Sequence, residues 1–460
     1  MKKFIILFCM FFPLFLHAQQ FESSIKSISY TQDDSYTQKI RVFDKQTTIA
    51  LSKKSGSIYI FYLIVDGSNT ANIFEMPTGY EISDFQILGD IVYFCGYHKN
   101  SSGIQIGIIG NFDINNAFYG NGNVEITDIN NTLHVDKIKA YLEPANPTFT
   151  HIVGIGKNIG TTNNSSCFID FNNKINYPNW DYNVFEHSYL LSNLYENITD
   201  IELTDKFVVT VSSVANTSWV LLRRYYNDDP SDVSLQHKFY ANLNSTGSIY
   251  TPLDRTFFVE KLYDDNVSIV SSAADNTSEF TYINVVDLNN GTPVLNYNRR
   301  IEHHDKNIIR DLEYSIIDRN LLILTSVNDV GNKDWKDVIF YAELDISATL
   351  PQTIKAIFLP NYSPKYPYLN SLCIYKDFHY STIGLDPNNY ELFLFNKDKQ
   401  YDLSNSCNKY DYLQMNNIIP QSNFNPFNDL NNQTSNSANF IMFSQPNNAV
   451  NVHFDCYNTH

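Results

Sequence analysis

The chain has 460 residues and a formal net charge of −17, and charged residues make up only 18% of it. An acidic balance without a basic cluster argues against nucleic acid and anionic lipid as partners. A hydrophobic content of 43% with 15% aromatic residues, together with many Ile, Val, Thr and Asn, is typical of a folded protein made of strands and turns.

The N-terminal segment predicts export. Residues 1–18 combine Lys2 and Lys3, the apolar run "FIILFCMFFPLFL" and Ala18 before a polar stretch, as a signal peptide does. The run is shorter than the ~20 residues of a spanning helix, and no later stretch predicts a membrane span. We therefore expect cleavage after Ala18, one mature domain over residues 19–460, and a place in the periplasm, at the cell surface or outside the cell.

A repeated unit fills most of the mature chain: an apolar strand, a turn rich in Asn, Ser or Gly, and a second apolar strand. It is clearest in "VVTVSSVANTSWVLL" from Val208 and "VSIVSSAADNTSEFTYI" from Val267. We interpret the shared Ser-Ser and Asn-Thr-Ser as the residues that reverse the chain. Further copies begin at Ile58, Ile91, Thr150, Leu321, Phe378 and Phe440.

A short strand that contains an acid or its amide precedes most of these hairpins. The acids and the amide are Asp84, Asp128, Asp200, Glu260, Asp311 and Asn370. Their spacings, about 44 to 72 residues, are those of a propeller blade with its loops. The sequence therefore predicts an all-β chain, a single β-propeller of about seven, alternatively eight, four-stranded blades, with the ring closed by the two chain ends. Residues 184–195 are the one stretch expected to form a short helix.

The run "ISDFQILGDIVYFCGY" from Ile82 with "IGIIGNFDI" from Ile106 resembles a segment of secreted bacterial β-propellers of unassigned function. The likeness covers one blade clearly and the others loosely. It implies a propeller fold and export, and it carries no catalytic residues onto this chain.

The repeated acids predict a ring of carboxylates if their strand is the innermost of each blade. Asp84, Asp128, Asp200 and Asp311, with Glu260, would then face one rim of the channel and could bind Ca²⁺. The alternative is that each carboxylate accepts hydrogen bonds from backbone N–H groups of the preceding turn. We favour this alternative because a repeated position usually encodes repeated structure.

An aromatic insertion over residues 176–195 lies in the longest interval between the acids. Trp180, Tyr182 and Tyr189 could stack on a sugar or hold a peptide at the propeller rim. The alternative, which we favour, is that these rings only pack the insertion onto its blade.

Five cysteines remain in the mature chain, and none forms a C-x-x-C pair or a zinc-binding spacing. In an oxidising compartment we expect Cys407 and Cys456 to be the preferred disulfide pair, because both lie in the C-terminal segment.

The sequence contains no G-x-S-x-G, H-E-x-x-H or phosphate-binding loop, so no catalytic residue is assigned. It predicts a monomeric binding, recognition or scaffold module for a glycan or protein ligand, with no cofactor other than the Ca²⁺ considered above. One alternative is a polysaccharide hydrolase or lyase in which Asp128, Asp200 and Asp311 converge near the axis. Another is a structural component of a surface complex, which would carry a large apolar patch.

Overall fold

The computed structural model defines a β-propeller within the described part of the chain. It describes residues 24–29, 36–44, 47–54, 58–65, 68, 70–119, 122–129, 133–143, 146–159, 165–172, 181–186, 196–214, 218–225, 237–242, 251–274, 279–289, 293–302, 306–316, 319–328, 335–344, 352–358, 371–375, 379–386, 391–398, 409–418, 425–427, 433–437, 439–445 and 448–455. The signal peptide predicted for residues 1–18 lies outside these ranges.

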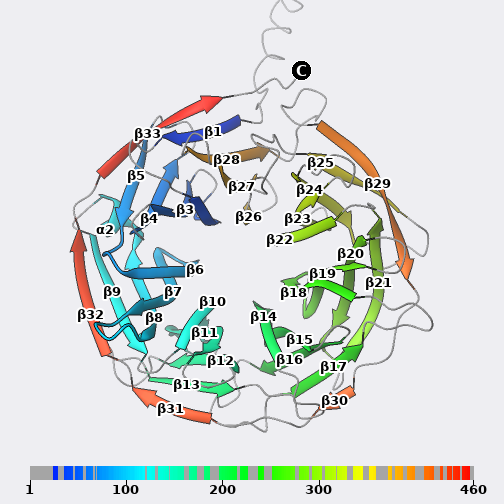
Figure 1. Ribbon diagram of the computed structural model, residues 1–460, viewed down its shortest axis with the longest axis horizontal. Coiled ribbons are helices and arrows are strands. Elements are labelled where there is room, and N and C mark those ends of the chain that lie inside the picture. Colours follow the sequence, from blue (N-terminus) through cyan, green and yellow to red (C-terminus); the bar gives the residue numbers. More distant parts are fainter. Residues whose placement is uncertain are drawn as a thin grey trace, which may run out of the picture.

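Groups of four antiparallel strands surround a central axis (Figure 1). The first groups in the chain are β2 (Tyr36–Val42), β3 (Thr47–Lys54), β4 (Ile58–Val65) and β5 (Thr70–Glu75); β6 (Tyr80–Leu88), β7 (Ile91–Lys99), β8 (Gln105–Asp113) and β9 (Gly122–Ile129); β10 (Leu133–Glu143), β11 (Asn146–Asn158), β12 (Ser165–Asn172) and β13 (Asp181–Glu186). The next are β14 (Glu196–Leu203), β15 (Phe207–Val214), β16 (Ser218–Tyr225) and β17 (His237–Asn242); β18 (Thr251–Lys261), β19 (Asn266–Ala274), β20 (Glu279–Asp287) and β21 (Val294–Glu302).

The ring closes where the two chain ends meet. The remaining groups are β22 (Lys306–Ser315), β23 (Asn320–Asn328), β24 (Trp335–Glu343) and β25 (Gln352–Phe358), then β26 (Ser371–Tyr375), β27 (His379–Asp386), β28 (Glu391–Asp398) and the N-terminal β1 (Ser24–Ser29). β1 also pairs with the C-terminal strand β33 (Asn448–Asp455). The innermost strands β2, β6, β10, β14, β18, β22 and β26 contact one another in this order, and β26 contacts β2. The prediction that both chain ends close the ring is confirmed.

The C-terminal segment adds strands to the outside of these groups, in reverse order around the ring (Figure 1). They are β29 (Lys409–Ile418), β30 (Asn425–Phe427), β31 (Gln433–Ser437), β32 (Asn439–Gln445) and β33. β32 pairs with β9, whereas β33 pairs with β5 and β1. The hairpin predicted from Phe440 is therefore wrong, because its two strands lie in different sheets. The other predicted hairpins are confirmed.

The outer strands also change the number of sheets. β29 pairs with both β21 and β25, and β33 with both β5 and β1. Each of these strands joins two four-stranded groups into one nine-stranded sheet, and the described residues form five hydrogen-bonded sheets in all. The prediction of seven or eight separate blades is wrong at this level, since a shared strand makes neighbouring groups continuous.

Neighbouring groups bury apolar side chains between them. The ring centroids of Phe61 on β4 lie 5.4 Å from Phe85 on β6 and 5.0 Å from Phe112 on β8. Such edge-to-face contacts add about 0.5–1.5 kcal/mol each beyond the burial of the rings. Because both faces of a sheet are covered, β4 is buried almost throughout, which explains its continuous apolar sequence.

The two Ser-Ser pairs lie inside strands and not in turns. Ser212 and Ser213 belong to β15, Ser271 and Ser272 belong to β19, and all four are buried. The interpretation of Ser-Ser as chain-reversing residues is therefore wrong.

In several of the four-stranded groups, the first strand carries a β-bulge. The second strand of the same group needs a small residue, or threonine in one case, opposite this bulge. Ser52, Gly96, Gly156, Ser212 and Thr325 pair with the residue that precedes the bulge. A Cβ atom on Gly96 would lie 1.8 Å from the carbonyl oxygen of Glu81, and one on Gly156 would lie 2.1 Å from that of His134. The bulge thus brings the backbone of the first strand against the second.

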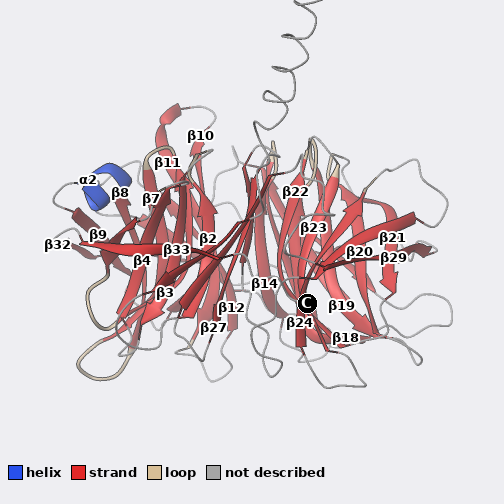
Figure 2. Ribbon diagram, turned by 90° about the horizontal axis from the view of Figure 1, so that it is seen from above, coloured by secondary structure: helices blue, strands red, loops and turns tan. Residues whose placement is uncertain are grey.

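Helix content is low, as predicted, but its position differs. The short helix α2 (Ile114–Tyr119) follows β8 and packs against β5, β8 and β9 at the edge of the ring (Figure 2). Part of the stretch expected to be helical, residues 184–186, belongs to strand β13. Among the described residues, no helix has the length and apolar character needed to cross a membrane.

Candidate functional site

An axial cavity of about 360 Å³ lies between the innermost strands. On most of these strands, the residue that follows a β-bulge lines the cavity. These residues form the first tier: Lys39, Asp84, Lys137, Asp200 and Asp311. Because side chains two positions apart lie on one face of a strand, a second tier follows. It consists of Arg41, Gln86, Lys139, Glu202 and Glu313, with Glu260 on β18.

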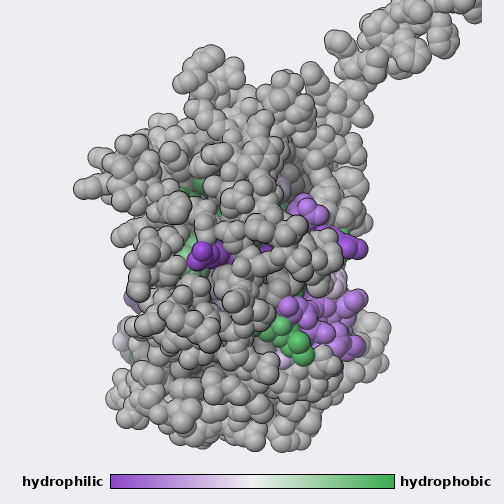
Figure 3. Space-filling model, turned by 90° about the vertical axis from the view of Figure 1, so that its right-hand side faces the viewer, coloured by the Kyte–Doolittle hydropathy of each residue, from purple (hydrophilic) through white to green (hydrophobic). Residues whose placement is uncertain are grey.

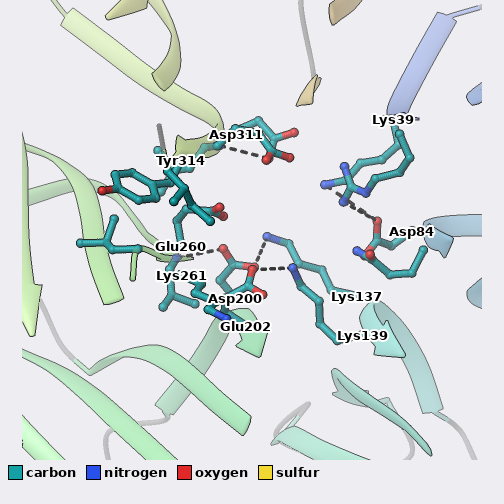
Figure 4. Close-up of a pocket in the computed structure, with 17 residues that line it drawn as sticks. Lys39, Asp84, Lys137, Lys139, Asp200, Glu202, Glu260, Lys261, Asp311 and Tyr314 are labelled. Atoms are coloured by element: carbon teal, nitrogen blue, oxygen red, sulfur yellow. Dashed lines mark hydrogen bonds and ion pairs between the residues drawn. The ribbon is translucent and has the colours of Figure 1, made fainter. Parts of the chain in front are cut away.

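The charges in this cavity are separated by sign. Apart from Lys261 of β18, the bases lie on β2 and β10, and most of the acids lie on β14, β18 and β22 (Figure 4). Lys137 Nζ donates to Asp200 Oδ1 at 2.8 Å, and Lys139 Nζ donates to Glu202 Oε2 at 2.5 Å. These ion pairs tie β10 to β14.

Asp84 is the exception, an acid among the bases. Its Oδ1 lies 3.6 Å from an Arg41 nitrogen and 3.9 Å from Lys39 Nζ. This Oδ1 atom accepts no hydrogen bond from the residues that the structure describes.

The first-tier carboxylates also tie each inner strand to the next. Asp84 Oδ2 accepts from the backbone N–H of Ile138 at 3.2 Å, and Asp200 Oδ2 accepts from that of Val259 at 3.0 Å. Asp311 Oδ2 accepts from the N–H of Leu372 at 2.9 Å and from the Ser371 hydroxyl at 2.8 Å. Asp84, Asp200 and Asp311 thus accept from backbone N–H groups, as the favoured sequence interpretation expects, whereas no such bond is seen for Asp128 or Glu260 among the described residues. The donors belong to the next inner strand and not to the preceding turn.

Three of the four aspartates predicted as Ca²⁺ ligands line the cavity, as does Glu260. Asp84, Asp200 and Asp311 line the cavity, but Asp128 lies on β9, the fourth strand of its group, beside His98 Nε2 at 3.0 Å. Within the described ranges, no group of three or more His, Cys, Asp or Glu residues is placed to hold a metal ion. Ca²⁺ binding stays a prediction.

The other predicted site residues lie largely outside the described part of the chain. Trp180, Tyr189, Cys407 and Cys456 fall outside it. Tyr182 belongs to β13, where it pairs with Phe171 of β12 and Asn436 of β31. The buried cysteines Cys95, Cys167 and Cys373 lie within the sheets. Neither the aromatic site nor the disulfide is tested by these residues.

The bases of the cavity were missed because the sequence search followed acids only. "KIRV" from Lys39 and "KIKA" from Lys137 have the same charged–apolar–charged order as "DIEL" from Asp200 and "DLEY" from Asp311. This alternation, taken regardless of the sign of the charge, marks the inner strands β2, β10, β14 and β22.

Two carboxyl groups of the second tier have raised pKa values. Burial, and then the negative charges of Glu313 and Glu202, raise the pKa of Glu260 well above its usual range. Burial is also the largest influence on Glu313, and with the repulsion of Asp311 and Glu202 it raises the pKa of Glu313 to about 8 against the opposing effect of Arg41 and Lys139. Asp311 is different. Burial acts to raise its pKa, but Lys39, Arg41 and its hydrogen bonds together lower it.

This raised pKa predicts how Glu313→Gln changes stability with pH. The folded protein keeps a proton on Glu313 up to about pH 8, whereas the unfolded chain releases it near pH 4.3. The free energy of unfolding therefore falls as the pH rises between these values. Glutamine removes this loss, so the variant should be more stable than the wild type by about 1–2 kcal/mol at pH 9 and nearly equal to it at pH 4. Urea unfolding at both pH values measures the difference. The exposed Glu343→Gln serves as control, and a Glu313→Gln effect that does not depend on pH would contradict the prediction.

A Ser–His–Asp cluster on the inner strands is not a nucleophilic triad. Ser83 Oγ lies 3.4 Å from His134 Nε2, and Asp136 Oδ1 lies 3.6 Å from the same nitrogen. In a triad the hydroxyl and the carboxylate contact opposite ring nitrogens, so that a proton can be taken by one while the other is oriented. This cluster lacks that arrangement.

The exposed large apolar side chains of the described residues are scattered over the fold. They are Ile104, Tyr119, Leu142, Ile159, Val294 and Ile316, which come from separate elements. In the side view of Figure 3 the described hydrophobic surface is a small area beside hydrophilic residues.

Comparison with known proteins adds no assignment. No protein-family model matches the chain, and no curated protein matches it. The propeller fold implied by the resemblance to secreted bacterial propellers is confirmed by the structure, while a relationship to those proteins has no support from these comparisons.

Proposed function

We propose that the protein is an exported, monomeric binding module whose ligand site is the axial cavity. The observation that carries this proposal is a cavity of about 360 Å³ lined by charged groups, some of which have no partner of their own. Among the described residues, the carboxyl groups of Glu260 and Glu313 make no hydrogen bond and no ion pair. Ligand pockets usually have volumes of about 300–1,000 Å³, so a polar segment of a glycan or a peptide fits here. Export rests on residues 1–18.

A second ligand site remains part of the proposal. The aromatic residues Trp180, Tyr182 and Tyr189 would bind a sugar or a peptide at the rim, away from the axis. Because this site uses stacking and the cavity uses charge, variants of the two can be compared directly.

A thermal-shift screen of the mature chain tests both sites. The panel contains neutral and acidic oligosaccharides, short peptides, amino acids and CaCl₂. We expect at least one organic ligand to raise the Tm of the wild type, and we expect Glu260→Gln with Glu313→Gln to reduce that shift by more than half. The Glu343→Gln control should keep it. The cavity proposal is overturned if no compound shifts the Tm, or if Trp180→Ala abolishes a shift that the double variant retains.

One observation favours a second function, hydrolysis or β-elimination of a polysaccharide. Glu313 keeps its proton at neutral pH while Asp311, two residues away on β22, is ionised. A protonated and an ionised carboxyl with separate environments form the acid–base pair that glycoside cleavage requires. Asp128 takes no part, since it lies on β9. Release of reducing ends or of unsaturated products from a polysaccharide panel, lost in Glu313→Gln, would establish this activity.

A further inference from the structure

Different walls of the axial cavity carry basic and acidic side chains that are only partly paired with one another. On one wall, Glu260 of β18 and Glu313 of β22 make no hydrogen bond or ion pair with any described residue, although both line the cavity. Strands β18 and β22 are in contact, so the two carboxyl groups come from neighbouring strands. A cation bound between them would favour loss of their protons and would then meet carboxylate oxygens from two sides.

The other wall has spare donors. Arg41 and Lys39 of β2 share a single carboxylate, Asp84, and their nitrogens stay 3.6 and 3.9 Å from its Oδ1. Arg41 Nη1 donates to the backbone carbonyl of the preceding residue, Ile40, at 2.9 Å. A guanidinium has five N–H donors and an ammonium three, so this wall can bind an additional carboxylate.

The remaining charged groups of the cavity already have partners. Lys261 of β18 pairs with Asp205, and Asp311 accepts from the Leu372 N–H and the Ser371 hydroxyl. Lys137 binds Asp200 and Lys139 binds Glu202, at 2.8 and 2.5 Å. These pairs lie on β10 and β14, between the β2 wall and the β18–β22 wall in the order of the ring (Figure 4). The bases of β2 and the unpaired carboxyl groups of β18 and β22 therefore lie on different walls, and a ligand with one charged group would bind at only one of them.

We propose that the cavity binds a small zwitterion, with its ammonium or guanidinium group at Glu260 and Glu313 and its carboxylate at Arg41 and Lys39. This inference rests on the proposed binding function and specifies its ligand. An organic cation suits the wall formed by Glu260 and Glu313 better than Ca²⁺ does. Calcium takes six to eight oxygen ligands, and the described residues bring no group of three acids to one point.

Linear ω-amino acids test this inference, because they separate an amine from a carboxylate by a chosen length. Isothermal titration of the full mature chain uses glycine, aminobutanoate, aminohexanoate and aminooctanoate as probes. Butylamine, hexylamine and octylamine each lack the carboxylate, and butanoate, hexanoate and octanoate each lack the amine. We expect at least one amino acid to bind about tenfold or more tightly than both of its single-charge analogues, since each lost charge removes charge-assisted hydrogen bonds.

Variants assign the two ends of the ligand. In Glu260→Gln with Glu313→Gln, the best amino acid should bind no more tightly than the matching carboxylate. In Arg41→Gln, it should bind no more tightly than the matching amine, and Glu343→Gln should bind as the wild type does. The comparison of analogues on the wild-type chain needs no variant and holds even if a variant fails to fold.

Several outcomes would overturn the inference. Equal binding of an amino acid and its amine would indicate a cation site, and binding of CaCl₂ alone would indicate a metal site. Cavity-dependent binding of an oligosaccharide from the screen, without binding of any amino acid, would overturn the zwitterion assignment and leave the binding function intact. Absence of binding by the screen and by the amino acids would overturn both.

Discussion

Asp200→Ala should lower the free energy of unfolding by about 3 kcal/mol, because this buried carboxylate joins three inner strands. Its Oδ1 accepts from Lys137 Nζ of β10 at 2.8 Å, and its Oδ2 accepts from the Val259 N–H of β18 at 3.0 Å. Alanine leaves a partly buried ammonium without its anion and a buried N–H without its acceptor. Urea unfolding at pH 7, followed by circular dichroism and fluorescence, measures the loss.

Two variants separate the causes of that loss. Asp200→Asn keeps an oxygen for the Val259 N–H but removes the charge that binds Lys137, so it should cost less than alanine does. Asp205, whose side chain is 56% exposed, forms an ion pair with Lys261 at the surface. Asp205→Ala should therefore change stability by no more than about 0.5 kcal/mol. Equal effects of Asp200→Ala and Asp205→Ala would show that the inner strands do not depend on the axial carboxylate.

Gly96→Ala should be at least as damaging, by about 3 kcal/mol or more, through a backbone collision. Gly96 lies on β7 opposite Ile82, where β6 bulges, and an added Cβ would stand 1.8 Å from the carbonyl oxygen of Glu81. Main chain cannot move aside as a flexible side chain can, so β6 and β7 must separate at the bulge. The variant should show a lower Tm and a lower yield of folded protein.

The matched control for Gly96 is the equivalent position in another group of strands. Ser212 lies on β15 opposite Ile198, again at the bulge, and already has a Cβ atom. Ser212→Ala removes only a hydroxyl and should cost about 1 kcal/mol or less. If Gly96→Ala proved as mild as Ser212→Ala, the close approach of the two strands would be refuted.

The axial acids divide into two kinds, and this division decides which of them can act on a ligand. The acids of the first tier are Asp84, Asp200 and Asp311. In each of them, one carboxylate oxygen accepts a hydrogen bond from a backbone N–H group of the next inner strand. These residues act chiefly in holding the ring together. Glu260 and Glu313 of the second tier make no such bonds among the described residues, so the free energy of their burial can be recovered by a ligand. The sequence pattern pointed to the first kind and to Glu260 of the second kind, but not to Glu313.

The sequence by itself determined the local structure of this protein. Alternating and continuous apolar runs about turn clusters identified the strands and most hairpins, because strand period and turn chemistry depend on a few adjacent residues. The all-β class and the circular arrangement followed from the repetition of such hairpins. The charged alternation on the inner strands was also present in the sequence, in "DIEL" from Asp200 as in "KIKA" from Lys137.

Only the tertiary structure decided how distant strands pair. β33 pairs with β5 and β1, and β29 joins β21 to β25. Backbone hydrogen bonds make these pairings, and every strand offers the same N–H and C=O groups. No residue type therefore marks the partner, and the number of continuous sheets could not be read from the sequence.

The tertiary structure also decided which charges meet at the axis. "ITDI" occurs twice, yet its Asp200 lies on the inner strand β14 and its Asp128 on the outer strand β9. The inner position next to β6 is taken by Lys137 of β10 instead. A side chain faces the axis only when its strand is innermost and its bulge sets the register, and both conditions depend on pairing with other strands.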